Sequence, residues 1–148
     1  MTVPIVSALV AATIIILQQI LMFTVGIHRA RASIGVGFGE DQDLERKIRR
    51  HGNLAENGAL FIATLALAEM VGVPQMIVLG FGGAFVLARV SHAIGMGSLS
   101  GSHLADGGAL FKGMRAFGAF ATVLSGIGLG AMLIYVSATS LTAANLPF

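Results

Sequence analysis

Four apolar stretches dominate this chain and restrict the folds that are open to it. They run over about residues 3–27, 54–73, 76–94 and 114–139. A helix of roughly 20 residues crosses the hydrocarbon core of a bilayer. Because lipid offers no hydrogen bonds to the backbone, such segments span it as helices. We therefore predict an all-α membrane protein, in which residues 1–148 form a single four-transmembrane-helix bundle.

The residue content agrees with a membrane protein. Hydrophobic residues make up 55% of the chain and charged residues only 11%, whereas soluble domains carry about 25% charged residues. The third stretch contains a charged residue, Arg89, within its apolar run. We expect the first stretch to be a span rather than a signal peptide, since its apolar run exceeds the roughly 7–15 residues of a signal-peptide core. Cysteine is absent, so the chain offers no thiol of its own for catalysis, a disulfide or a metal.

The basic residues predict the orientation in the membrane. All nine Lys and Arg residues lie within 29–50 and 89–115, and the short connection at 71–75 has none. With four spans, the first and third loops share one side, and the positive-inside rule makes that side cytoplasmic. We predict a multi-pass integral membrane protein with both termini on the non-cytoplasmic side, in the inner membrane if the source is a bacterium.

The connections carry recognisable turn and cap signals. The Gly-rich run 34–39 lacks the strand–turn–helix context of a dinucleotide site, and we interpret it as a hinge. Asp41 or Asp43 is expected to cap the helix that follows. Val73-Pro74 predicts a tight turn, and residues 95–113 are expected to form the longest loop. Small residues in the last span favour close helix packing, namely Gly118, Gly126, Gly128 and Gly130.

A polar helix face leads directly into the second apolar stretch. At 100° per residue its members fall within about 120° of one another: Arg46, Arg49, Arg50, Asn53, Glu56 and Asn57. Lys47 and Arg50 are explained if basic residues beside the span set the membrane topology or contact anionic lipid headgroups. It does not account for the amides and the carboxylate deeper in, because polar groups there are kept where they pair or bind something. We favour ligand binding over structural pairing for this face.

Two further positions extend the candidate site. Arg89 and His92 are three residues apart and share a helix face, so they either line a polar pocket or serve a structural pair between Arg89 and Glu56 or Glu69. Arg115, at the start of the last span, either snorkels to the interface or points into the bundle and stabilises an anion. No two histidines have the spacing of metal ligands, and no metal site is expected.

Three segments together resemble the membrane-associated proteins in eicosanoid and glutathione metabolism, the MAPEG family, which includes microsomal glutathione transferases. The first is E-R-x-x-R-x-H-x-N-x-x-E-N at Glu45–Asn57, and it is fairly specific. The second is A-R-V-S-H-A-x-G at Ala88–Gly95, and the third is R-x-x-G-x-x-x-T at Arg115–Thr122. The resemblance covers nearly the whole chain, including its length and its four-span layout.

The resemblance implies a homotrimer with a glutathione site between neighbouring subunits, open to the cytoplasm. It implies a transferase or peroxidase that uses glutathione as co-substrate, without a metal, against lipophilic electrophiles or hydroperoxides, as in detoxification. Arg115 would be the catalytic residue that stabilises the thiolate. The glutathione-binding residues would be Arg29, Arg49, Asn53, Glu56, Arg89 and His92.

The chain departs from the family pattern at three positions. Met96 stands where eukaryotic members often have Tyr, Ala116 follows Arg115 in place of a hydroxyl residue, and Gly52 replaces an Arg of some relatives. These departures disfavour eicosanoid synthesis. The alternative function is a non-enzymatic membrane scaffold or a small transporter subunit. A transporter is expected to show inverted repeats or broken helices, and the sequence shows neither.

Overall fold

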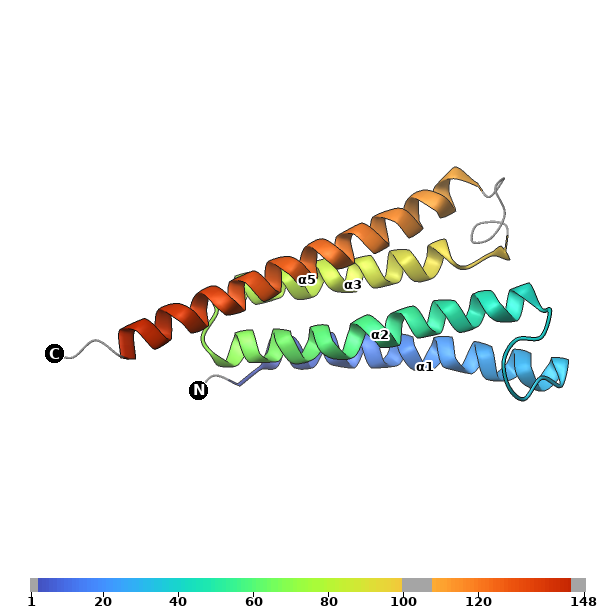
Figure 1. Ribbon diagram of the computed structural model, residues 1–148, viewed down its shortest axis with the longest axis horizontal. Helices are drawn as coiled ribbons and strands as arrows, with labels where there is room; N and C mark the ends of the chain where they lie inside the picture. Colours follow the sequence, from blue (N-terminus) through green and yellow to red (C-terminus); the bar gives the residue numbers. More distant parts are fainter. Residues whose placement is uncertain (1–2, 100–107, 145–148) are drawn as a thin grey trace.

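A computed structural model describes residues 3–99 and 108–144 as a long bundle of helices. The helices are α1 (Ile5–Ala32), α2 (Gln42–Met70), α3 (Gln75–Gly95) and α5 (Ala109–Ala144). Each packs lengthwise against its neighbours, α1 most closely with α2 and α3 with α5 (Figure 1). The predicted all-α membrane fold with four helices is confirmed. The middle of the predicted loop at 95–113, including His103 and Asp106, lies outside the described residues.

Three of the four helices, α1, α3 and α5, are long and apolar enough to cross a membrane. Within the described ranges α2 is not among them. Its apolar half carries Asn53, Glu56 and Asn57 near the middle and Glu69 near the end, and these groups lower its hydropathy. The second predicted span, residues 54–73, therefore stays a prediction. Its polar side chains need protein partners if they lie in a membrane.

The helix boundaries follow local signals in the sequence. Gly72 adopts φ +91°, and Pro74 is the N-cap of α3, so the predicted turn between α2 and α3 is present. The Asp41 carboxylate accepts a hydrogen bond from the backbone N–H of Leu44 at 2.9 Å, which makes Asp41 the N-cap of α2. The last helix begins at Ala109, so the third loop is shorter than predicted, because Ala109, Leu110, Phe111 and Lys112 are compatible with a helix and Gly113 is tolerated within it.

Two glycines bring α3 and α5 into direct backbone contact. A Cβ atom on Gly118 would lie 2.6 Å from the carbonyl oxygen of Ala88 and from the amide nitrogen of His92. A Cβ atom on Gly95 would lie 2.5 Å from the amide nitrogen of Arg115. Only a residue without a side chain fits such approaches. The packing prediction is thus confirmed for Gly118, and these contacts fix where Arg115 lies along α3.

The other glycines of α5 differ from one another. A Cβ atom on Gly128 would lie 2.7 Å from the Phe81 ring, so this position also packs tightly against α3. At Gly126 and Gly130 a Cβ atom would meet nothing within 4 Å. The packing interpretation therefore does not extend to these two positions within one subunit.

A buried carboxylate caps the start of α1 at the other end of the bundle. Glu69 is 5% exposed and accepts hydrogen bonds from the backbone N–H groups of Val6 and Ser7 at 3.0 and 2.9 Å. The Ser7 hydroxyl donates to it as well, at 2.7 Å. A negative charge at a helix N-terminus is stabilised by the helix dipole and its free N–H groups. Glu69 is therefore a structural cap, and the suggested Arg89–Glu69 pair is wrong.

A charged cluster surrounds the start of α2. Asp43 accepts from Arg46 Nε at 2.8 Å and lies 2.9 Å from Lys47 Nζ. His28 joins the cluster through its Nε2 atom, 2.8 Å from the Asp41 carboxylate. Burial raises the pKa of Asp43, but hydrogen bonds from Lys47 and Arg46 outweigh it, so its pKa lies below the usual 3.8. The pKa of Asp41 is also lowered, first by the hydrogen bond from the Leu44 N–H and then by the one with His28.

These lowered pKa values predict acid sensitivity at the start of α2. A carboxylate whose pKa falls on folding contributes stability above its unfolded pKa, here 3.8, and the contribution is lost as pH drops through the folded value. Thermal unfolding of the wild type should therefore move to lower temperature as pH falls below 3.8. The Asp43→Asn variant should show a shallower dependence, and Glu40→Gln, on the preceding turn, should follow the wild type. If the unfolding temperature depends on pH equally in Asp43→Asn and in the wild type, the charged cluster is not the cause of the acid sensitivity.

Candidate functional site

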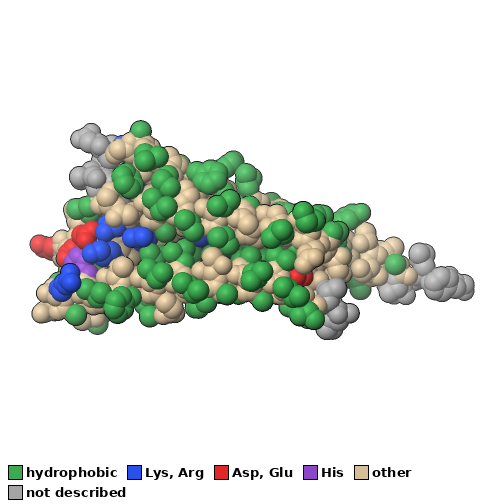
Figure 2. Space-filling model, turned by 180° about the vertical axis from the view of Figure 1, so that it is seen from behind, with side chains coloured by type: hydrophobic (Ala, Val, Ile, Leu, Met, Phe, Trp, Pro, Cys, Tyr) green, Lys and Arg blue, Asp and Glu red, His purple; other side chains and the backbone are tan. Residues whose placement is uncertain are grey.

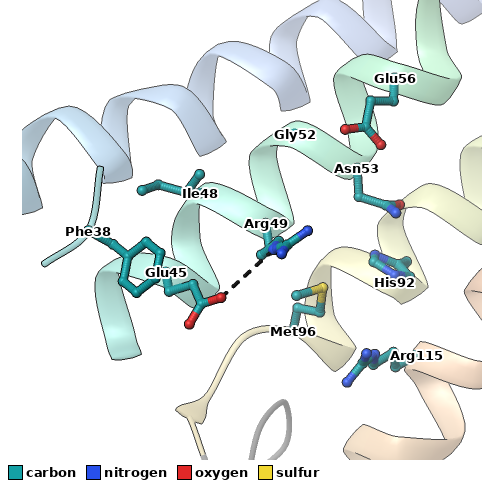
Figure 3. Close-up of a pocket in the computed structure, with 10 residues that line it drawn as sticks. All are labelled: Phe38, Glu45, Ile48, Arg49, Gly52, Asn53, Glu56, His92, Met96 and Arg115. Atoms are coloured by element: carbon teal, nitrogen blue, oxygen red, sulfur yellow. Dashed lines mark ion pairs between the residues drawn. The ribbon is translucent and has the colours of Figure 1, made fainter. Parts of the chain in front are cut away.

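A polar pocket of about 740 Å³ lies where α2 begins, α3 ends and α5 begins (Figure 3). Its volume falls in the range of about 300–1,000 Å³ that is typical of small-molecule sites. The two cations in it are Arg49 and Arg115, and the two carboxylates are Glu45 and Glu56. The whole lining consists of Phe38, Glu45, Ile48, Arg49, Gly52, Asn53, Glu56, His92, Met96 and Arg115.

One side of α2 forms the first wall of this pocket. Arg49 Nε lies 3.9 Å from the Glu45 carboxylate, and the Arg49 side chain is 73% exposed. An exposed pair at this distance is weak, so the Arg49 guanidinium can exchange Glu45 for a ligand carboxylate. Glu56 lies two turns further along the helix and is exposed in the single chain. Gly52 stands between them and leaves the space above the helix backbone open (Figure 3).

Arg89 lies behind this wall and does not line the pocket. It is 2% exposed, and its Nη2 donates to Asn53 Oδ1 at 2.7 Å while its Nη1 donates to Thr122 Oγ1 at 3.3 Å. Its Nε is buried without a hydrogen-bond partner among the residues that the structure describes. Arg89 thus ties α3 to α2 and α5. The suggested pair with Glu56 is wrong, because the guanidinium is turned toward the amide of Asn53.

The bond from Arg89 also sets the orientation of Asn53. Since Oδ1 accepts from the guanidinium, the amide Nδ2 is the group left to face the pocket. An amide N–H₂ in that position is a donor for a carbonyl or carboxylate oxygen. Arg89 therefore acts on the pocket through Asn53 rather than by direct contact.

Side chains from α3 and α5 form the opposite wall. His92 and Met96 are each 6% exposed, one turn apart at the end of α3. Figure 3 shows Arg115 next to them, reaching from the start of α5 toward the pocket. The close contact of Gly95 with the Arg115 backbone fixes the base of this side chain. The pocket thus combines a deep imidazole with a cation at its mouth.

Arg46, on the predicted polar face, turns away from the pocket. It is 4% exposed, bonds to Asp43 through Nε and Nη2, and donates through Nη1 to the carbonyl oxygen of Met96. This buried guanidinium holds the start of α2 against the end of α3. It therefore keeps the two pocket walls in register, and this role was not predicted from the sequence.

The structure brings most of the predicted site residues together. Arg49, Asn53, Glu56, His92 and Arg115 line one pocket, and Arg89 lies directly behind it. Arg29 lies apart: its Nη1 donates to the carbonyl oxygens of Ile34 and Gly35 at 3.4 and 3.2 Å. These bonds hold the chain as it leaves α1, so a role of Arg29 toward a ligand stays a prediction for the assembled protein.

Two apolar lining residues were not predicted. Phe38 comes from the Gly-rich connection, where Gly37 and Gly39 adopt positive φ values of 69° and 58°, and Ile48 adjoins Arg49 on α2. The positive φ values bend the connection so that an aromatic side chain reaches the pocket. Among residues 3–99 and 108–144, no group of three or more His, Asp or Glu side chains could hold a metal ion.

The fold defines an integral membrane bundle with a polar pocket at one end. The sequence model of the MAPEG family matches residues 7–135, and the chain belongs to this family. The family contains glutathione-dependent transferases and peroxidases as well as members that are not enzymes. No curated protein matches the chain.

Proposed function

We propose that this protein is a membrane-bound, glutathione-dependent transferase or peroxidase. The observation that carries the proposal is the charge pattern of the 740 Å³ pocket, which the guanidinium groups of Arg49 and Arg115 line together with the Glu56 carboxylate. Glutathione has two carboxylates, one amine and one thiol. Guanidinium groups bind carboxylates with paired hydrogen bonds, and the Glu56 carboxylate suits the amine. Asn53 Nδ2 adds a donor for a peptide carbonyl.

Arg115 is the proposed catalytic residue. A thiol of ordinary pKa is mostly protonated at neutral pH, and the thiolate is the nucleophile, so a nearby cation raises the reactive fraction. In conjugation, the sulfur forms a bond to the electrophilic carbon and the leaving group departs with its electron pair. In peroxide reduction, the thiolate sulfur attacks one oxygen, the O–O bond breaks, and the alkoxide leaves and takes a proton, so the sulfur becomes a sulfenic acid. The thiol of a second glutathione then attacks the sulfenic sulfur, the disulfide forms, and the sulfenic oxygen leaves as water.

We further propose a homotrimer with the site shared between subunits and facing the cytoplasm. Glu56 is exposed in the single chain, within the apolar half of α2, and a carboxylate facing lipid is unfavourable. The apolar half of α2 also exposes Ala55, Ala59 and Ala63, and small side chains allow another helix to approach closely. A neighbouring subunit packed against this half of α2 would cover Glu56 and close the pocket. The trimer number comes from the resemblance, and the cytoplasmic side comes from the basic residues of the first and third loops.

Glutathione should therefore protect the protein against thermal unfolding. A ligand that binds only the native state stabilises it by about 2.7 kcal/mol at a hundred times its Kd. Glu56→Gln should melt like the wild type without ligand, because Glu56 has no hydrogen bond or ion pair within the described part of the chain. With glutathione its protection should largely disappear, since breaking a desolvated charge pair costs about 2–5 kcal/mol. Melts in detergent, with calorimetric titration of both proteins, measure this.

Glu40→Gln is the charge-matched control, and it should keep full protection because Glu40 lies outside the pocket. Absence of any protection in the wild type would favour the non-enzymatic scaffold or transporter subunit. Native mass spectrometry of the same samples tests the assembly. A stable monomer that carries glutathione would contradict the shared site and leave the binding residues in place.

A further inference from the structure

A second polar pocket of about 530 Å³ lies between the end of α1 and the start of α2. It has no residue in common with the first pocket. Figure 2 shows Lys, Arg, Asp, Glu and His side chains gathered at this end of the bundle, next to a surface that is otherwise largely hydrophobic. The pocket is lined by Thr24, Ile27, His28, Arg31, Ala32 and Lys47.

Two contacts hold the Lys47 ammonium group in place at this pocket. Lys47 Nζ lies 2.9 Å from the Asp43 carboxylate and donates to His28 Nδ1 at 2.7 Å. The other ring nitrogen of His28, Nε2, lies 2.8 Å from the Asp41 carboxylate. Neither carboxylate lines the pocket. Lys47 is thus held with one N–H left to donate, and the His28 ring lies beside it.

Arg31 supplies the second cation. It is exposed, and it makes no hydrogen bond or ion pair with any residue in the described ranges. Arg46, the other cation of the cluster, is occupied with Asp43 and the Met96 carbonyl. The lining of the pocket therefore carries two positive charges and no negative one, a composition that attracts an anion such as a phosphate group.

An apolar stripe on α1 leads directly into the pocket. Ile16, Ile20, Phe23 and Ile27 are 61%, 56%, 68% and 36% exposed, and their spacing of three and four residues places them on one helix face. Arg31 follows one turn after Ile27. From Ile16 to Ile27 the helix rises about 16 Å at 1.5 Å per residue, which is about half of a hydrocarbon core of about 30 Å. The stripe therefore has the length of one lipid leaflet and ends at a cationic pocket.

We propose that this pocket binds the phosphate headgroup of an anionic phospholipid, one of whose acyl chains lies along the α1 stripe. Charge complementarity selects the headgroup, and the continuity of the pocket with a leaflet-length apolar face selects a lipid over a soluble anion. Basic side chains at this depth attract anionic lipids. The proposal does not depend on glutathione binding, because the two pockets lie on different sides of α2.

The test is a lipid titration of the intact protein, purified in detergent and followed by native mass spectrometry. Phosphatidylglycerol should bind more tightly than phosphatidylcholine with the same acyl chains. Arg31→Gln should weaken phosphatidylglycerol binding about fivefold, the effect expected for one basic residue near an anionic surface. Lys47→Gln should weaken it further, because Lys47 is the more enclosed of the two cations.

Lys112→Gln is the control, because Lys112 is a basic residue near the start of α5 that does not line this pocket. It should bind phosphatidylglycerol like the wild type. Equal binding of both lipids to the wild type, or unchanged binding to Arg31→Gln, would overturn the headgroup site. Displacement of phosphatidylglycerol by inorganic phosphate at low concentration would overturn the lipid as occupant in favour of a soluble anion. Arg31→Gln is the cleaner of the two pocket variants, since it disturbs none of the bonds that hold Lys47.

Discussion

Replacing Arg115 with Ala should raise the pKa of the glutathione thiol bound to the protein and slow its reaction at neutral pH. A positive charge near sulfur favours the thiolate over the thiol, and its removal reverses that preference. Loss of one preorganised charge-stabilising donor typically lowers a rate about a hundredfold or more. Arg115→Lys should retain part of the activity, because it keeps the charge but not the planar fork of donors. The measurement is the ultraviolet absorbance of bound thiolate as pH is varied.

Lys112→Ala is the matched control, since it removes a cation one turn earlier on the same helix, outside the pocket lining. Its bound thiol should titrate as in the wild type. If Arg115→Ala also titrates like the wild type, Arg115 is an interfacial anchor. The activating charge would then have to come from Arg49, the other cation of the pocket.

The order of the elements could be predicted from the sequence because local rules determine it. Four apolar runs predict four helices, Asp41 or Asp43 predicts the start of α2, and Pro74 predicts the start of α3. The last predicted span begins at residue 114, whereas the helix α5 begins at Ala109. The apolar run, from which the span was inferred, marks the part of a helix that meets lipid and not where the helix itself begins.

The candidate site was predictable to the extent that it follows helix periodicity. One face of α2 carries Arg49, Asn53 and Glu56, and the structure keeps all three in one pocket. The same periodicity assigned Arg46 to this group, and it failed there. The acceptor that draws Arg46 inward is the Met96 carbonyl, 50 residues away in the chain. Such a group becomes available only where α3 ends against α2, which helix periodicity alone does not reveal.

The partners of Arg89 show the same limit. The sequence placed Arg89 on a face with His92 and offered two carboxylates as partners, since opposite charges pair well. The structure instead gives Arg89 an amide and a hydroxyl, Asn53 and Thr122. The Glu69 carboxylate instead accepts hydrogen bonds from the free N–H groups at the start of α1. Competition among distant donors for one carboxylate depends on how the helices pack, and a single sequence does not encode it in any local pattern.

The close contact of α3 with α5 leads to the largest expected effect on stability. In Gly118→Ala, the new Cβ would meet backbone atoms of Ala88 and His92 at 2.6 Å, and backbone atoms cannot move aside as a flexible side chain can. The two helices must separate, and overpacking of this kind costs about 1–3 kcal/mol. The separation would also move His92 away from Arg115, so activity should fall together with the unfolding temperature. Thermal melts and activity assays of the same preparation measure both effects.

Gly126→Ala provides the comparison on the same helix. Its Cβ would meet nothing within 4 Å, and Ala favours a helix over Gly by about 0.5–1 kcal/mol. This variant should melt at or above the temperature of the wild type and keep its activity. If both variants lose stability equally, the loss at Gly118 cannot be assigned to its contact with α3. If Gly118→Ala alone loses activity while its melt is unchanged, the contact serves to place Arg115 beside His92 rather than to hold the bundle together.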